Sequence, residues 1–155
     1  MTLQGACHES PVDGSELSME AVHWVLAARD QGLPVEVVLV NVQEPANLYE
    51  LVVAHDADVL SQVSTDAGMH CLELARALLS AAGVECVSEV AIGDPAHMAI
   101  EVGERHGVDL VVMGAESAGA LGSGLVGSVA NEVLRTSTVA VVIVKLPADD
   151  EGLSP

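Results

Sequence analysis

The fold of this chain is decided by one stretch, which runs from Leu110-Val-Val-Met-Gly114 through a glycine-rich segment to Gly127-Ser128 and on to an apolar run over 139–145. Its pattern predicts a buried strand, a loop, a short helix over 128–136 and a second buried strand. The loop region contains five glycines within 14 residues: Gly114, Gly119, Gly122, Gly124 and Gly127. Glycine lets backbone N–H groups approach an anion closely, and Ser128 is placed to cap the following helix, whose first N–H groups would face a phosphate.

The rest of the chain alternates between helical and strand-like patterns. Helices are expected over 15–30, 59–82 and 96–106, and strands over 35–42, 84–92 and 110–113. This alternation predicts an α/β fold, an open parallel sheet with helices on both faces. In such sheets, ligands bind at the carboxyl ends of the strands, where the strand order reverses.

The helix expected over 59–82 has the clearest amphipathic pattern. Its apolar stripe is predicted to contain Val63, Ala67, Cys71, Leu74, Leu78 and Ala81. His70 falls beside this stripe and is expected to be packed rather than to bind a metal.

Two segments resemble the universal stress protein family. They are the turn Pro11-Val12-Asp13-Gly14-Ser15 and the run from Gly127 to Leu134 that precedes the valine-rich strand. The nucleotide-binding branch of that family carries the motif G-x2-G-x9-G-[ST], which aligns here with Gly114, Ser117, Gly127 and Ser128. Serine replaces the second glycine, and Ala118 stands where a basic residue often follows. The resemblance covers about residues 11–145 and implies a five-stranded parallel, Rossmann-like sheet in the order 3-2-1-4-5.

The resemblance also implies a ligand, an adenine nucleotide such as ATP, with Mg²⁺ to offset its charge. Asp13 would hold its ribose or base end, and Val42 would contact adenine through its backbone. The implied cofactor-binding residues are Pro11, Val12, Asp13, Val42, Met113, Gly114, Ser117, Gly127, Ser128 and Val129. Two alternatives stay open: a surface loop that no longer binds nucleotide, and an Asp13 that only caps the next helix.

The N-terminal segment departs from the family pattern. The family's first strand is apolar and central in its sheet, whereas residues 7–10 here are Cys-His-Glu-Ser. A central parallel strand is normally apolar because both of its faces are covered. Either this segment pairs despite its polarity, or the chain is irregular before the turn at Asp13.

Composition excludes several classes of function. With 23 acidic and 5 basic residues and a net charge of −18, the chain should be repelled by nucleic acids and by anionic membrane surfaces. The segment 1–146 is expected to form a single domain, and 147–155 an acidic, disordered tail. Three widely spaced cysteines indicate free thiols in a reducing cytoplasm, and no apolar run is long enough for membrane insertion.

No catalytic motif stands out. The chain has neither a G-x-x-x-x-G-K-[ST] loop nor a G-x-S-x-G elbow, and no metal site is expected among its scattered histidines. At most slow ATP hydrolysis is expected, so regulation is favoured over turnover.

The last strand, over 139–145, should lie at a sheet edge that invites pairing. A homodimer through this strand is expected, together with an unidentified regulatory partner protein. The alternative function is a dimeric scaffold that binds no nucleotide.

Overall fold

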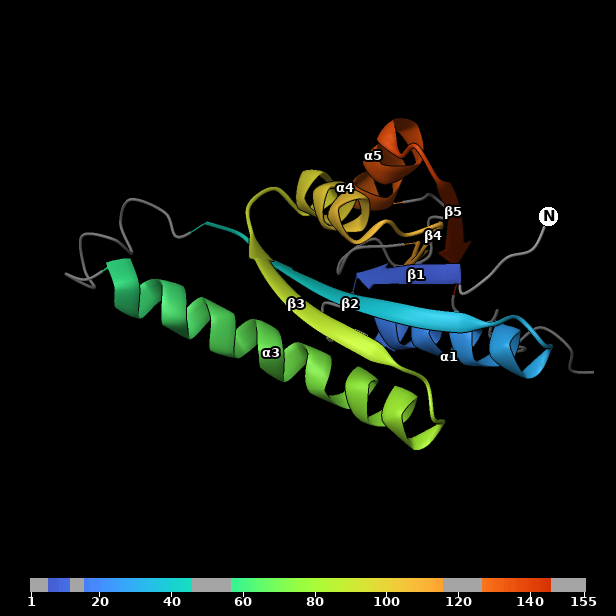
Figure 1. The fold of residues 1–155 in the computed structure, drawn as a ribbon. Helices are drawn as coiled ribbons and strands as arrows, with labels where there is room; N and C mark the ends of the chain where they lie inside the picture. Colours follow the sequence, from blue (N-terminus) through green and yellow to red (C-terminus); the bar gives the residue numbers. More distant parts are fainter. Residues whose placement is uncertain (1–5, 12–15, 46–56, 116–126, 146–155) are drawn as a thin grey trace, which may run out of the picture.

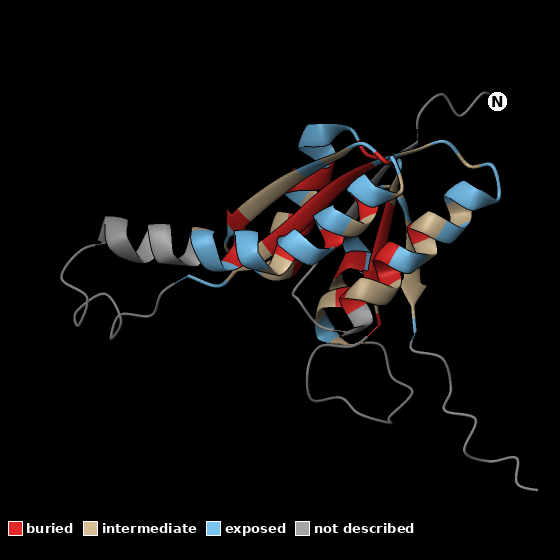
Figure 2. Ribbon diagram, turned by 90° about the horizontal axis from the view of Figure 1, so that it is seen from below, coloured by how far each residue is buried: buried red, intermediate tan, exposed pale blue. Residues whose placement is uncertain are grey.

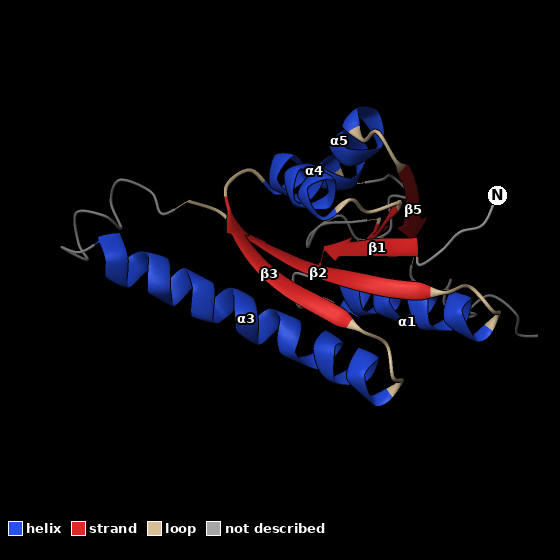
Figure 3. Ribbon diagram, in the orientation of Figure 1, coloured by secondary structure: helices blue, strands red, loops and turns tan. Residues whose placement is uncertain are grey.

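The computed structural model describes residues 6–11, 16–45, 57–115 and 127–145. Strands and helices alternate along them (Figure 3). The elements are β1 (Ala6–Pro11), α1 (Glu16–Asp30), β2 (Val35–Gln43), α3 (Ala57–Ala81), β3 (Cys86–Ile92), α4 (Pro95–His106), β4 (Leu110–Gly114), α5 (Ser128–Thr136) and β5 (Ala140–Val144). The predicted α/β class is therefore confirmed.

The five strands form one parallel sheet in the order β3-β2-β1-β4-β5, which is the order that the family resemblance implies. Helices α1 and α3 lie on one face of the sheet, and α4 and α5 lie on the other (Figure 1). Strand β5 ends the sheet on one side, as expected for an edge strand, and β3 ends it on the other.

The core lies on both faces of the sheet. Residues 37–40 of β2 are all buried, and so are residues 111–113 of β4. Such continuous apolar runs are typical of parallel strands covered on both sides. Figure 2 shows buried residues in the strands and on the helix surfaces that face them.

Strand β1 pairs despite its polar sequence, so the first of the two N-terminal alternatives is the correct one. Its backbone pairs with β2 from Ala6 to Pro11 and with β4 at His8 and Glu9. Ladder hydrogen bonds join backbone groups and do not require apolar side chains. Pro11, which has no N–H to donate, ends the strand.

The predicted apolar stripe of α3 is wrong by one position. Among the described side chains, the buried ones are Gly68, Leu72, Ala75 and Leu79, whereas Leu74 is 60% exposed. Small and apolar residues recur on two adjoining strips of this helix, so periodicity alone could not choose between them. His70 is also exposed and lies 3.6 Å from the Glu73 carboxylate, rather than being packed.

Some of the predicted features lie outside the described residues. They are Val12, Asp13, Ser117 and the tail over 147–155. In the part of the chain that the structure describes, no helix is both long and apolar enough to cross a membrane.

A partly exposed cluster of charged side chains joins β3 to the end of α4. The Glu89 carboxylate accepts from Arg105 Nη2 at 2.6 Å and lies 2.7 Å from His106 Nε2. Burial by itself would raise the pKa of Glu89, but the hydrogen bonds and charges of His106 and Arg105 together lower that pKa below its ordinary value of 4.5. The ionised carboxylate therefore stabilises the folded state.

This cluster predicts a pH-dependent loss of stability. Because the folded-state pKa of Glu89 is lowered, its contribution is complete above the unfolded value near 4.5 and is lost as the pH falls through the lower, folded-state pKa. Glu89→Gln should lower the free energy of unfolding by about 1 kcal/mol at pH 7. The cost should shrink below pH 4, measured by urea denaturation. The control is Glu101→Gln, which breaks the more exposed pair with His97 and should change the free energy of unfolding little. If Glu89→Gln costs no more than this control, the cluster adds nothing beyond an exposed ion pair.

Candidate functional site

The strand order reverses between β1 and β4. Strand β2, the next strand in the sequence, lies on one side of β1, and β4 lies on the other. Pro11 pairs with Val40 of β2, and β1 runs parallel to β4 with Glu9 paired to Val111. The carboxyl ends of both strands thus meet at one edge of the sheet, which is the position where open parallel sheets bind ligands.

The N-terminus of α5 is fixed to the same edge. Ala115, directly after β4, donates its N–H to the Val144 carbonyl at 2.9 Å, and its own carbonyl accepts from the Gly127 N–H at 2.5 Å. The two ends of the glycine-rich loop are therefore joined. The start of the helix lies beside the ends of β4 and β5, as the sequence predicted for a phosphate site.

Two details of the predicted loop chemistry are wrong. Ser128 is the first residue of α5, and the N-cap is Gly127, which has no side chain to offer the helix. The Gly127 N–H is also taken by Ala115, so it does not face a ligand. The first intrahelical hydrogen bond runs from the Asn131 N–H to the Gly127 carbonyl. The N–H groups of residues 128–130 come before it and therefore have no acceptor within the helix.

The backbone conformation of Gly127 does not itself require a glycine. Its φ of −61° and ψ of 163° are open to any residue, so no left-handed backbone requires glycine here. What glycine provides is the missing side chain. Among the described residues, no side chain caps the first N–H groups of α5, which carry the positive end of the helix dipole.

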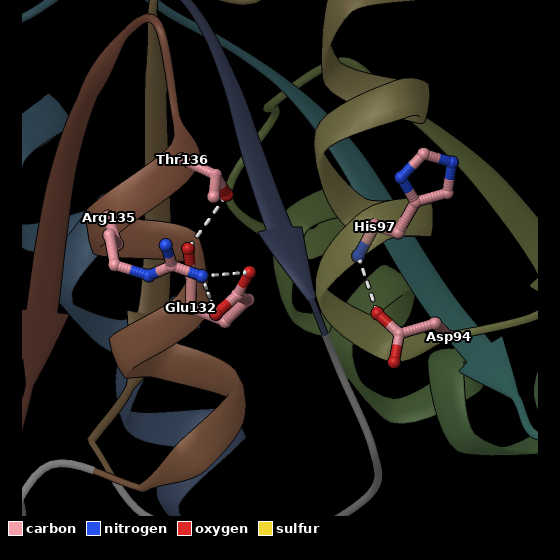
Figure 4. Close-up of polar contacts among 5 residues, drawn as sticks. All are labelled: Asp94, His97, Glu132, Arg135 and Thr136. Carbon is pink, nitrogen blue, oxygen red and sulfur yellow. Dashed lines mark hydrogen bonds and ion pairs between the residues drawn. The ribbon is translucent and has the colours of Figure 1, made fainter.

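A cavity of about 300 Å³ lies between the N-terminal ends of α4 and α5. It is lined by Asp94, Ala96, Ser128, Val129 and Glu132. Figure 4 shows Asp94 and Glu132, which come from these neighbouring segments. Asp94 caps α4, since its Oδ2 accepts from the His97 N–H at 3.0 Å.

Glu132 is held by its own helix. Its two carboxylate oxygens accept from Arg135 Nη2 at 2.8 and 2.7 Å (Figure 4). The same contact raises the pKa of Arg135 above its ordinary value. Sequence reasoning missed Asp94 and Glu132 as site residues. Their positions in the sequence were the available signal. Asp94 directly precedes Pro95 at the start of a helix, and Glu132 lies one helical turn after Ser128.

The other predicted site residues that the structure describes lie at the same edge. Met113 is buried at the end of β4, next to Gly114. Val42 is half-buried near the end of β2, pairs with Ala91, and packs against the apolar cluster under α4. Neither Val42 nor Met113 lines the cavity. The predicted binding residues therefore fall into two groups, one at the ends of strands and one at the start of α5.

A second cavity, of about 350 Å³, lies between α3 and β3. It is lined by Asp66, Met69, His70, Leu72, Glu73, Arg76 and Ser88. It opens beside the middle of an edge strand, away from the carboxyl ends of β1 and β4. Nowhere in the described segments, this cavity included, are three His, Cys, Asp or Glu side chains grouped to hold a metal ion.

The fold and this edge define a doubly wound α/β protein in which α5 begins beside the switch point with no described side chain as its cap. The universal stress protein family model matches residues 10–145, so the chain belongs to this family. It is 29% identical over 138 residues to the universal stress protein MJ0531 of Methanocaldococcus jannaschii, covering 88% of this chain and 80% of that one. It is 27% identical over 140 residues to YxiE of Bacillus subtilis, covering 86% and 95%.

Solved structures share the fold. The structure of hypothetical protein MJ0577 matches with a TM-score of 0.79 and 25% identity, over 93% of this chain and 98% of that one. A family member from Arabidopsis thaliana, solved with AMP bound, matches with a TM-score of 0.65 and 20% identity, over 94% of both chains. A universal stress protein in complex with cAMP matches with a TM-score of 0.61 and 22% identity, over 90% and 96%.

Proposed function

We propose that this universal stress protein binds an adenine nucleotide in the cytoplasm and acts as a regulatory module rather than as a fast enzyme. The phosphate end would lie on the N–H groups of Ser128 and Val129, and the base would lie toward Val42. Catalysis would be limited to slow ATP hydrolysis. The alternative, a scaffold without nucleotide, shares every feature of the fold and differs only at this edge.

One observation carries the proposal: no described side chain caps the start of α5, and the first residues of this helix line a cavity between the N-terminal ends of α4 and α5. Uncapped helix N-termini attract phosphates because their N–H groups and dipole both favour negative charge. The AMP and cAMP complexes of proteins with this fold support the choice of an adenine nucleotide.

ATP is proposed as a ligand in its Mg²⁺ complex. The carboxylates of Asp94 and Glu132 supply oxygen atoms, which are the ligands that Mg²⁺ accepts. A bound cation would neutralise part of the triphosphate charge at this acidic site. The chain's own contribution is to hold these oxygens at the helix ends and to offer the N–H groups of α5.

Changing Gly127 should separate binding from folding. Asp or Asn fits its backbone angles and is a favourable N-cap, so either variant should alter the free energy of unfolding by only a few tenths of a kcal/mol, in the stabilising direction. The new side chain would occupy the N–H groups that the phosphate needs. We expect Gly127→Asp to weaken nucleotide binding by about tenfold or more, because its carboxylate also repels phosphate.

Isothermal titration calorimetry with AMP, and with ATP plus Mg²⁺, measures this effect. Wild type should bind with micromolar affinity. Gly127→Asn should bind more weakly than wild type and more tightly than Gly127→Asp, since the two variants differ only in charge. Wild type that takes up neither ligand at millimolar concentration, or variants that bind as wild type does, would favour the scaffold.

A homodimer through β5 is also proposed. Residues 141–144 are half-buried, and no strand among the described residues pairs with the outer backbone edge of β5. Pairing with a second copy would satisfy that edge and protect it from aggregation. Sedimentation equilibrium should find a species of twice the chain mass at micromolar concentration, and a monomer throughout the concentration range would contradict the pairing.

A further inference from the structure

Two carboxylates face the phosphate end of the proposed site. Asp94 and Glu132 line the same cavity as Ser128 and Val129, which carry the uncapped N–H groups. The cavity lies at the N-terminal ends of both α4 and α5, and each helix end supplies roughly half a positive charge. The two carboxylates therefore outweigh the two helix ends by about one charge before Arg135 is counted.

Among the described residues, Glu132 has a cationic partner and Asp94 has none. Arg135 holds both oxygens of Glu132, although its side chain is 72% exposed, so solvent screens part of its charge. The Asp94 carboxylate accepts from the backbone N–H of His97, whose ring lies instead 3.6 Å from Glu101. The negative charge of the cavity is therefore only partly compensated.

We propose that Asp94 and Glu132 act as a charge filter that makes affinity fall as the phosphate chain gains negative charge. This inference rests on the proposed nucleotide site and names its specificity. AMP binds more tightly than cation-free ATP, and ATP binds well only when a divalent cation neutralises its phosphates. The bound state then reports both the AMP level and the charge state of ATP.

The test compares adenosine, AMP and ATP, each with a chelator and with Mg²⁺, by equilibrium binding. Glu132→Gln keeps the size of the side chain and removes its charge, and Asp94→Asn remains a good helix cap. Each should raise the affinity for cation-free ATP by about fivefold and leave that for adenosine unchanged. Arg135→Gln should act in the opposite direction, because it exposes the charge of Glu132.

The control is Glu73→Gln, on an exposed side chain of α3 across the sheet from the cavity. It changes the net charge by the same amount and should leave the preference for AMP over ATP intact. Added salt should reduce this preference in wild type, as screening requires and a purely steric filter would not.

Two results would overturn the inference in different ways. Cation-free ATP that binds as tightly as AMP, with no change in Glu132→Gln, removes the filter and leaves the nucleotide site in place. Failure of adenosine, AMP and ATP to bind under every condition removes the nucleotide site itself, and the filter with it.

Discussion

Leu39→Ala is expected to lower the free energy of unfolding by about 3 kcal/mol. Leu39 lies in the middle of β2, has no exposed surface, and belongs to the apolar cluster between the sheet and helices α1 and α3. Truncation removes buried methyl groups and leaves a cavity, because stiff β-branched neighbours such as Val22 and Val37 fill the space poorly.

The matched control is Leu74→Ala, the same chemical change on α3. Leu74 is 60% exposed, so its truncation should cost no more than about 0.5 kcal/mol. Urea denaturation followed by circular dichroism measures both values. Similar losses for the two variants would contradict the assigned burial and the corrected face of α3.

Gly68→Val should lower the free energy of unfolding by a similar amount, about 3 kcal/mol. A Cβ at Gly68 would lie 2.6 Å from Val90 Cγ1 and 2.8 Å from Asn41 Oδ1. Val90 is stiff at χ1, and Asn41 is buried and bonded to Gln43 at 2.6 Å, so neither side chain can move aside cheaply. Helix α3 therefore approaches β2 and β3 closely only because this residue has no side chain.

Two further variants test that explanation. Ala67→Val places the same residue on the exposed side of the same helix and should cost only about 0.5 kcal/mol. Val90→Ala removes the nearest atoms, so combining it with Gly68→Val should cost less than the sum of the two single changes. Strict additivity in the double variant would show that Gly68 and Val90 do not meet.

Most of the fold could be predicted because local patterns determined it. Helix α5 begins at Ser128 and ends at Thr136, as expected, and α4 ends before Gly107, whose φ of 65° suits glycine. These ends follow from glycine and proline chemistry, which acts within a few residues. The buried strands were visible as apolar runs for the same reason.

The failures of prediction depend on contacts between distant residues. The buried face of α3 is set by the close approach at Gly68, which involves Val90 of another element. The cluster of Glu89, Arg105 and His106 joins a strand to a helix end and leaves no local pattern. The pairing of β1 is likewise fixed by its neighbours on both sides rather than by its own side chains.

The candidate site shows the same division. Its strand-end residues, Val42, Met113 and Gly114, were expected from the family resemblance, and the structure places them at or near the ends of β2 and β4. Asp94 and Glu132 were missed because their importance comes from the way α4 and α5 lie together. Sequence also could not show that the Gly127 N–H is used by Ala115, which leaves the next residues to meet a ligand.

The central claim is that a nucleotide binds where β1, β4 and the start of α5 meet. Amide chemical-shift mapping during titration with AMP tests it most directly. The account predicts saturable shifts that are largest at Ser128, Val129 and Ala130, with smaller ones at Gly114 and Val42. Shifts centred instead on the cavity between α3 and β3, at residues 66–76, would place the ligand elsewhere and contradict the account.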